Sequence, residues 1–362
     1  MTTKMWPHAR HVAVLALLCS ACQHSSDSPV QHAAGATQQP DAPRDQRAGA
    51  ALAGGPHAIG ALAPAMTLKT IDGQTIDLAK LYGTKPVYLK FWATWCVPCR
   101  EQMPGFKRIY DAVGDRMHVV AVNDGLNDEA VSVRAFRDQY GLRMPIAIDD
   151  GKLAGALDLR VTVQHVVIGR DARLVYVDWE DGPKLDEAIQ RALSEPGPSG
   201  PATGRQVAIR PAFRPGDVVQ GLEATGIDGT AVPVGRSRSG RPRALVLFST
   251  WFESYLETSR PEDSQACRRI REEVERLVAK GDIEWLGIAG GAWESVTEVT
   301  EYRANTNTKL PLALDADGTV FQAFGIRKLP TIALLDADGR LVRLLGPEDR
   351  DLAGAVRALQ AK

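Results

Sequence analysis

The sequence lacks three features that would place it in common functional classes. Its 43 lysines and arginines are balanced by 44 aspartates and glutamates, and without a basic stripe nothing indicates nucleic-acid binding. After Cys22 the sequence has a single Cys-x-x-Cys and no His-x-x-x-His pair, which argues against structural zinc there, because that site needs about four ligands. The apolar run from Val12 to Leu18 is shorter than the roughly twenty residues that cross a bilayer.

Cysteine is scarce, with five in 362 residues, but two of them share one motif, Trp95-Cys96-Val97-Pro98-Cys99. Two thiols separated by two residues can close as a disulfide or open as a dithiol, and so carry two electrons reversibly. A purely structural disulfide here would close almost no loop and would constrain the unfolded chain very little. The motif therefore predicts redox chemistry.

The motif lies where a predicted strand ends and a predicted helix begins. Val87 to Trp92 is typical of a buried strand, and Arg100 to Val113 carries apolar residues at helical spacing. A thiolate at a helix N-terminus is stabilised by unpaired N–H groups and by the helix dipole, which lower its pKa. Cys96 is therefore the predicted nucleophile, and Cys99, roughly one turn further along, is the predicted resolving thiol.

A degenerate copy of the motif occurs later as Trp251-Phe252-Glu253-Ser254-Tyr255, at an offset of 156 residues (251 − 95). The segment from Asp171 to Val175 recurs from Asp338 to Val342, at an offset of 167 residues (338 − 171). Such long offsets indicate a duplicated domain rather than a solenoid, whose repeats are about 20 to 50 residues long. With Phe252 and Tyr255 at the thiol positions, the second copy cannot exchange disulfides. It is predicted either to bind a substrate or partner near Trp251, or only to pack against the first copy.

The repeat and the chain length predict two α/β domains, each with a mixed β-sheet flanked by helices. The predicted domains span residues 61–195 and 211–362, and the proline- and glycine-rich segment 196–210 is the predicted linker. Apolar runs after the first helix of each copy, Val119 to Val122 and Trp285 to Ala289, are typical of strands in a covered sheet. Strand-turn-strand signals end both copies.

The segment from Phe91 to Arg100, followed by Pro104, resembles the active site of the thioredoxin superfamily and is most similar to its TlpA-like branch. The resemblance implies two tandem thioredoxin-like domains, the first an exported thiol:disulfide oxidoreductase that acts as a reductase. It places Trp95 and Pro98 in the site with the two cysteines. It implies no cofactor beyond the redox-active Cys96–Cys99 disulfide. A protein disulfide substrate and a membrane electron donor are the implied partners.

Thioredoxin-like proteins carry a cis-proline that faces the cysteines, and the two copies differ at this position. The second copy has Pro330, whereas the first has Thr162 and Val163 at the aligned position, where the substrate groove is expected. A cis bond without proline costs about 3 kcal/mol. The loop beside Cys96 is therefore predicted to be trans or differently shaped.

Lys90 stands where thioredoxins usually hold a buried acid, and its counterpart in the second copy is Val246. A lysine near the thiols would favour the thiolate and so assist catalysis. Alternatively, only its stem packs and the ammonium reaches the surface. The sequence leaves both open.

A competing hypothesis assigns Cys96, Cys99 and His165 to a soft-metal site for Cu(I), as in exported thioredoxin-like copper chaperones, which also lack the cis-proline. Those chaperones space their cysteines by three residues, and their histidine lies earlier than His165. A lone histidine at the start of a strand is usually a half-buried polar residue. The redox hypothesis, which includes no metal, is therefore preferred.

Residues 1–22 have the layout of a secretory signal, and Ser20-Ala21-Cys22 resembles a bacterial lipobox that would make Cys22 the lipidated N-terminus. Plain cleavage is the alternative. Residues 23–60 are predicted to form a disordered tether. These features predict a periplasmic protein whose membrane contact is limited to a lipid anchor. The remaining Cys267 is spaced to face a helix core, with a resolving or interdomain thiol as the alternative.

Overall fold

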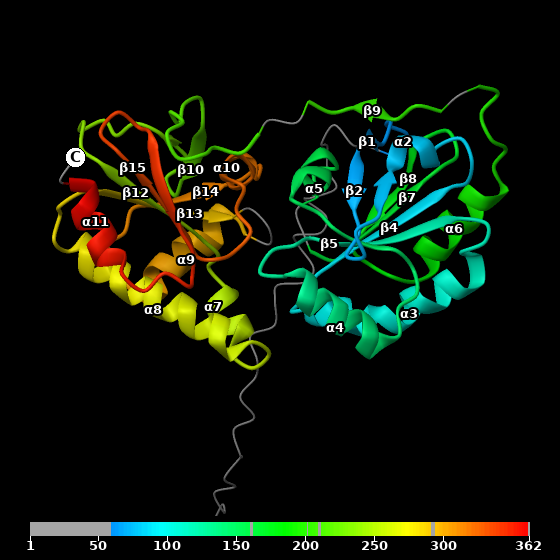
Figure 1. Cartoon of the computed structure of the whole chain (residues 1–362), viewed down its shortest axis with the longest axis horizontal. Helices are drawn as coiled ribbons and strands as arrows, with labels where there is room; N and C mark the ends of the chain where they lie inside the picture. Colours follow the sequence, from blue (N-terminus) through cyan, green and yellow to red (C-terminus); the bar gives the residue numbers. More distant parts are fainter. Residues whose placement is uncertain (1–58, 160–161, 201, 209–210, 291–293, 361–362) are drawn as a thin grey trace, which may run out of the picture. The chain divides into compact units, whose positions relative to one another are not determined.

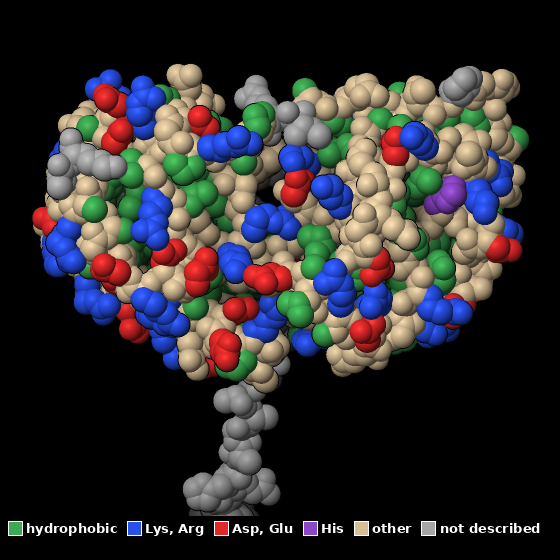
Figure 2. Space-filling model, in the orientation of Figure 1, with side chains coloured by type: hydrophobic (Ala, Val, Ile, Leu, Met, Phe, Trp, Pro, Cys, Tyr) green, Lys and Arg blue, Asp and Glu red, His purple; other side chains and the backbone are tan. Residues whose placement is uncertain are grey.

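The computed structural model describes residues 59–362, except 160–161, 201, 209–210, 291–293 and 361–362. The predicted signal segment 1–22, with Cys22, lies outside the described residues, as does the predicted tether apart from its last two residues. Among the described helices, none has the length and apolar character needed to cross a bilayer. Figure 2 shows basic side chains interspersed with acidic ones on the face in view, as the balanced composition leads one to expect.

The first sheet has five strands in the order β6-β5-β4-β7-β8 (Figure 1). Its central strand β4 runs parallel to β5 and antiparallel to β7. All six residues of β4 are buried, because the strand is covered on both faces of the sheet. The strands are β4 (Val87–Trp92), β5 (His118–Asn123), β6 (Ile146–Ile148), β7 (Gln164–Ile168) and β8 (Leu174–Asp178).

Two separate groups of buried side chains lie on the two faces of this sheet. One contains the apolar residues of α3, α4 and α6, and the other those of α2 and α5. The helices are α2 (Leu78–Leu81), α3 (Val97–Val113), α4 (Ala130–Tyr140), α5 (Lys152–Ala156) and α6 (Pro183–Ser194). Two short strands, β2 (Thr67–Lys69) and β3 (Thr75–Asp77), form a separate antiparallel pair.

The second sheet has seven strands in the order β11-β10-β14-β13-β12-β15-β16. Its strands are β10 (Glu223–Gly226), β11 (Ala231–Pro233), β12 (Arg243–Phe248), β13 (Glu284–Gly290), β14 (Leu312–Asp315), β15 (Thr331–Leu335) and β16 (Leu341–Leu345). Its helices are α7 (Phe252–Leu256), α8 (Pro261–Val278), α9 (Val296–Thr306), α10 (Thr319–Phe324) and α11 (Leu352–Gln360). The predicted mixed α/β class is confirmed.

The strand order β14-β13-β12-β15-β16 repeats that of the first sheet, with the same parallel and antiparallel neighbours. The pairing register repeats as well. Leu89 pairs with Val166 in the first sheet, and Leu245 pairs with Ala333 in the second. These pairs are related by the same offsets of 156 (245 − 89) and 167 (333 − 166) residues that the sequence shows. The register therefore supports the alignment of the two copies.

Part of the predicted linker packs against the first sheet's domain. Within the segment 196–210, strand β9 (Arg205–Gln206) pairs in parallel with β1 (Pro64–Ala65). Gly204 allows this close approach, since a Cβ there would lie 2.6 Å from the Ala63 carbonyl oxygen. The linker thus contributes a strand to the first copy, and the boundaries 61–195 and 211–362 stay predictions.

Candidate active site

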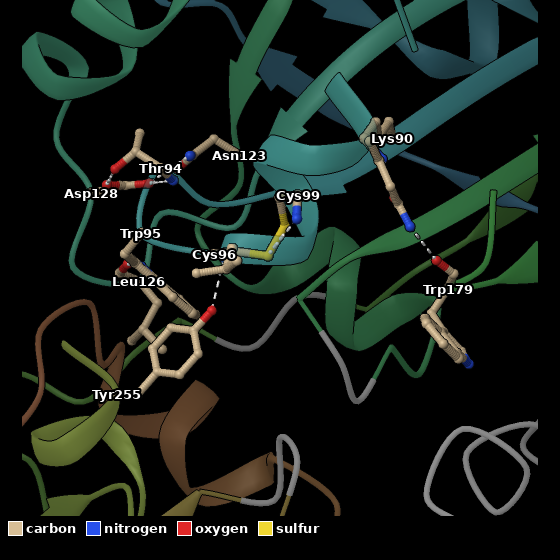
Figure 3. The surroundings of a disulfide bond; sticks show 12 residues. Lys90, Thr94, Trp95, Cys96, Cys99, Asn123, Leu126, Asp128, Trp179 and Tyr255 are labelled. Atoms are coloured by element: carbon tan, nitrogen blue, oxygen red, sulfur yellow. Dashed lines mark hydrogen bonds between the residues drawn. A yellow bond between two sulfur atoms is a disulfide. The ribbon is translucent and has the colours of Figure 1, made fainter. Parts of the chain in front are cut away.

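Cys96 and Cys99 form a disulfide at the start of α3 (Figure 3). Cys96 is the N-cap residue, and its Sγ accepts a hydrogen bond of 3.2 Å from the Cys99 N–H. Pro98 lies in the first turn of the helix, where its missing N–H costs no helical hydrogen bond. The Cys99 amide at the helix N-terminus thus points at Cys96 Sγ, which is an arrangement that stabilises a thiolate.

The loop that carries the motif is held by the loop after β5. Thr94 donates from its N–H and its hydroxyl to the Asp128 carboxylate, at 2.7 and 2.6 Å. Asn123 donates to the same carboxylate at 2.8 Å, and the Trp95 indole N–H donates to the Leu126 carbonyl at 2.7 Å. Asp128 therefore fixes the approach of the chain to Cys96.

Sequence reasoning missed Thr94, Asn123 and Asp128, although the repeat contains a signal. In the second copy Thr250 donates its N–H to the Glu294 carboxylate at 2.7 Å, at the corresponding place in the fold. A threonine directly before the tryptophan and an acid after the next strand therefore recur in both copies. Comparing the copies position by position would have brought out this pair.

Lys90 lies on β4, and its side chain is fully buried, with 0% exposed. Its Nζ donates to Gln102 Oε1 at 2.7 Å and lies 3.4 Å from His165 Nε2. Burial lowers the pKa of Lys90 to about 7, while the Asp181 carboxylate opposes this shift. The alternative in which its ammonium reaches the surface is therefore wrong.

His165 completes a buried polar cluster with Lys90. Its Nδ1 lies 2.6 Å from the Tyr88 hydroxyl, and its Nε2 lies 3.0 Å from Gln102 Oε1. Burial lowers the pKa of His165 well below its ordinary value, and repulsion from Lys90 adds to the effect. His165 is fully buried rather than half-buried, because the strand β7 is covered on both faces.

The second copy has no counterpart of this cluster. The register places Val246 at the position of Lys90 and Ile332 at that of His165. The offset of the first strand puts Ala244 at the position of Tyr88. At these aligned positions, a buried amine and imidazole thus occur in the copy that has the thiols and not in the other.

The cysteines and His165 do not come together as a metal centre. Across the described ranges, no group of three or more His, Cys, Asp or Glu side chains is placed to hold a metal ion. Both ring nitrogens of His165 already lie at hydrogen-bond distance from Tyr88 and Gln102. The soft-metal hypothesis therefore gains no support from the geometry.

The predicted substrate groove is covered. Thr162 is 8% exposed and Val163 is 0% exposed, so neither lines an open surface. In the part of the chain that is described, only the Leu329–Pro330 peptide bond is cis. Pro330 borders a small cavity of about 40 Å³ together with Phe252 and Cys267.

The degenerate motif lies directly against the active one. Trp95 makes an edge-to-face contact with Phe252, at 5.1 Å between ring centroids, and the Trp251 and Tyr255 rings lie at 6.1 and 6.2 Å. Tyr255 Oη also accepts a hydrogen bond of 2.8 Å from the Val97 N–H, at the N-terminus of α3 (Figure 3). The structure therefore joins the two copies through their equivalent motifs.

Comparison with known proteins identifies the family. Residues 59–177 match the AhpC/TSA family. Over 119 residues the chain is 34% identical to the thiol-disulfide oxidoreductase ResA of Bacillus anthracis, a match that covers 32% of this chain and 67% of that protein. The chain belongs to the thioredoxin-like thiol-disulfide oxidoreductase family. The predicted family and enzyme class are confirmed.

Two further relatives show how much of the chain these matches cover. The thioredoxin-like protein YneN of Bacillus subtilis is 44% identical over 91 residues, which are 25% of this chain and 53% of that protein. The match thus spans about half the length of YneN. A solved thiol:disulfide interchange protein from Chlorobium tepidum is 23% identical, with a TM-score of 0.34, and covers 38% of this chain and 99% of its own.

Proposed function

We propose that this protein is an exported reductase of protein disulfides that works through Cys96 and Cys99. The observation that carries the proposal is the disulfide at the N-terminus of α3, with Cys96 Sγ already accepting the Cys99 N–H. That arrangement favours a thiolate at Cys96 over one at an ordinary surface cysteine. Membership of the thiol-disulfide oxidoreductase family supports the same reaction.

In the proposed reaction the reduced enzyme begins as a Cys96 thiolate and a Cys99 thiol. The Cys96 thiolate attacks one sulfur of the substrate disulfide, whose S–S bond breaks, and the leaving sulfur takes up a proton. Cys99, after losing its proton, attacks Cys96 Sγ and displaces the second substrate thiol. The substrate gains two electrons, and the enzyme is left with the Cys96–Cys99 disulfide. A dithiol of a membrane electron donor would then restore the reduced enzyme.

Lys90 is proposed as a positioning residue that favours negative charge in the redox-active domain. A buried amine with a pKa of about 7 can hold or release a proton near neutral pH. Keeping it buried costs stability, and the second copy, without thiols, has Val246 instead. The loss of stability from burying an amine therefore occurs in the copy that carries out thiol–disulfide exchange.

The location is proposed from the N-terminal sequence alone. The signal layout of residues 1–22 supports export to the periplasm, and the lipobox-like Ser20-Ala21-Cys22 supports a lipid anchor on Cys22. The second domain is proposed to be a degenerate thioredoxin-like copy, which its repeated strand order and register support.

The direct test is catalysis of insulin disulfide reduction with dithiothreitol as the electron source. Wild type and Cys267→Ser are expected to accelerate the reaction, whereas Cys96→Ser is expected to lose all acceleration. An inert wild type would contradict the proposal. The reduction potential of the Cys96–Cys99 pair tests the direction, since a reductase is expected near about −270 mV and an oxidant near about −120 mV.

A further inference from the structure

The redox-active disulfide is closed off from solvent. Cys96 is 3% exposed, Cys99 is 0% exposed, and the neighbouring Trp95 is 2% exposed. Thiol–disulfide exchange requires direct attack on a sulfur atom, so its rate depends on access to that sulfur. A folded protein partner cannot bring its own sulfur to Cys96 in this arrangement.

The covering side chains come from the second domain. Phe252 and Leu256 of α7 are 1% and 0% exposed, and with Leu329 they belong to the same buried cluster as Cys96 and Cys99. Trp251 and Tyr255 pack at the edge of that cluster. The helix that occupies the place of the lost thiol motif therefore lies over the thiol motif that remains.

A charged contact holds the second domain in this position. Arg260, at the start of α8, donates to Asp128 Oδ1 at 2.6 Å and also bonds the Thr94 hydroxyl and the Asn127 carbonyl. The Asp128 side chain is fully buried, and that of Arg260 is 21% exposed. Charge-assisted hydrogen bonds in such surroundings are among the strong ones. Arg260 thus binds the residues that fix the loop leading to Cys96.

The loop before Pro330 makes a second, backbone-directed contact. The Asn127 N–H donates to the Arg327 carbonyl at 2.8 Å, and the Leu329 N–H donates to Asn127 Oδ1 at 2.8 Å. Lys328 adds an ion pair with Glu129 at 3.0 Å. The contacts of Arg260 and those of the Arg327–Leu329 loop both involve the loop after β5, beside the redox motif. Both sets of contacts therefore hold the same face of the first domain.

We propose that the second domain is a cap that closes the Cys96–Cys99 disulfide to protein partners, with Arg260 as its latch. This proposal rests on the proposed function. It means that protein partners exchange with Cys96 only in an open state, in which α7 and the Arg327–Leu329 loop have moved away from the redox motif. When only the open state reacts, the observed rate is the intrinsic rate multiplied by the open fraction. Weakening the contact of Arg260 with Asp128 must therefore raise the rate of exchange with protein partners.

The opposite role for the second domain predicts the opposite sign. If Trp251, Tyr255 and Arg260 bound the partner, their removal would slow exchange with proteins. A domain that only packed against the first copy would leave the rate unchanged. The sign of the change thus separates the three roles.

The test measures reduction of the oxidised full-length protein by two reductants, reduced thioredoxin as a folded dithiol protein and dithiothreitol as a small one. Each reductant breaks the Cys96–Cys99 bond and is itself oxidised to a disulfide. Acid quenching, alkylation and mass spectrometry follow the appearance of the two thiols. Arg276→Ala is the matched control, because Arg276 is an exposed arginine on the same helix α8.

Arg260→Ala is expected to raise the rate with thioredoxin about tenfold or more, which corresponds to about 1.4 kcal/mol lost from the closed state. The rise with dithiothreitol is expected to be smaller, and Arg276→Ala should match wild type. Tyr255→Phe, which keeps the ring and removes the hydroxyl that binds the Val97 N–H, should give a smaller rise if Arg260→Ala folds poorly.

If thioredoxin reduced both Arg260→Ala and Tyr255→Phe at the wild-type rate or more slowly, the proposal that the second domain is a cap would be overturned. Failure of the proposed function would look different. The Arg260→Ala disulfide would be reduced rapidly, yet the reduced protein would pass no electrons to insulin.

Discussion

Replacing Lys90 by methionine removes a buried amine while keeping a long, unbranched side chain. In wild type, burial lowers the pKa of Lys90 to about 7, whereas a lysine in the unfolded chain titrates near about 10.4. Between these two values the unfolded chain binds more protons at this group than the folded protein does. The free energy of unfolding of wild type therefore rises with pH in this window, and Lys90→Met lacks that rise.

The size of the effect follows from the same two values. One pKa unit corresponds to about 1.4 kcal/mol, and integrating the proton difference from pH 7 to pH 9.5 gives about 3 kcal/mol. Below about pH 6 both states are almost fully protonated, so Lys90 adds almost no slope there. The stability of Lys90→Met relative to wild type should thus fall by about 3 kcal/mol between pH 7 and pH 9.5.

Urea unfolding of the two proteins at pH 6, 7, 8, 9 and 9.5 measures this difference directly. Lys184→Met is the matched control for the substitution itself, because Lys184 is an exposed lysine. A difference between wild type and Lys90→Met that stays constant within about 0.5 kcal/mol would refute the reasoning, since Lys90 would then titrate alike in both states.

Three further predictions concern stability and reactivity. Phe252→Ala should lower the free energy of unfolding by about 3 to 5 kcal/mol, and Phe252→Leu should lower it by less, because this ring is buried against Trp95. A loss below about 1 kcal/mol for Phe252→Ala on urea unfolding would contradict that burial. Burial raises the pKa of the Cys267 thiol to about 12. Maleimide should therefore modify Cys267 far more slowly at pH 8 in the native protein than in urea. Equal modification rates in the two conditions would show an accessible thiolate. Lys328→Ala should cost less than about 1 kcal/mol on urea unfolding, because the ion pair with Glu129 is largely exposed; a larger loss would mean that the pair is far less hydrated than its exposure indicates.

The strands and the repeated strand order could be predicted because their signals are local or repeated. The apolar run Val87–Trp92 was predicted as a strand, and β4 has those bounds. The two repeat offsets reappear in the strand register, since the same spacing of apolar residues gives the same pairing. Lys90 was ambiguous because its charge favours the surface. Its apolar neighbours on both sides in the strand, however, mark a central strand, in which both faces are buried.

The contact between the two copies could not be predicted in the same way. Tyr255 and Val97 are 158 residues apart, and no periodicity relates Arg260 to Asp128. Such contacts depend on how two folded surfaces fit together, and that is decided by side chains from several loops at once. The strand β9 was missed for a related reason, since a proline- and glycine-rich segment has little strand propensity and pairs only because β1 is beside it.

The contact between the two Trp-anchored motifs favours thiols in only one of them. If residues 252 and 255 were cysteines, two dithiol pairs would face each other across the contact in which Trp95 touches Phe252. A thiolate of one pair could then attack the disulfide of the other, breaking that S–S bond and releasing one thiolate, and the resulting mixed disulfide would be a covalent crosslink between the domains. Aromatic side chains at these two positions bury apolar surface without that reaction. The association of the two halves can therefore stay noncovalent and reversible while one of them cycles between oxidised and reduced forms.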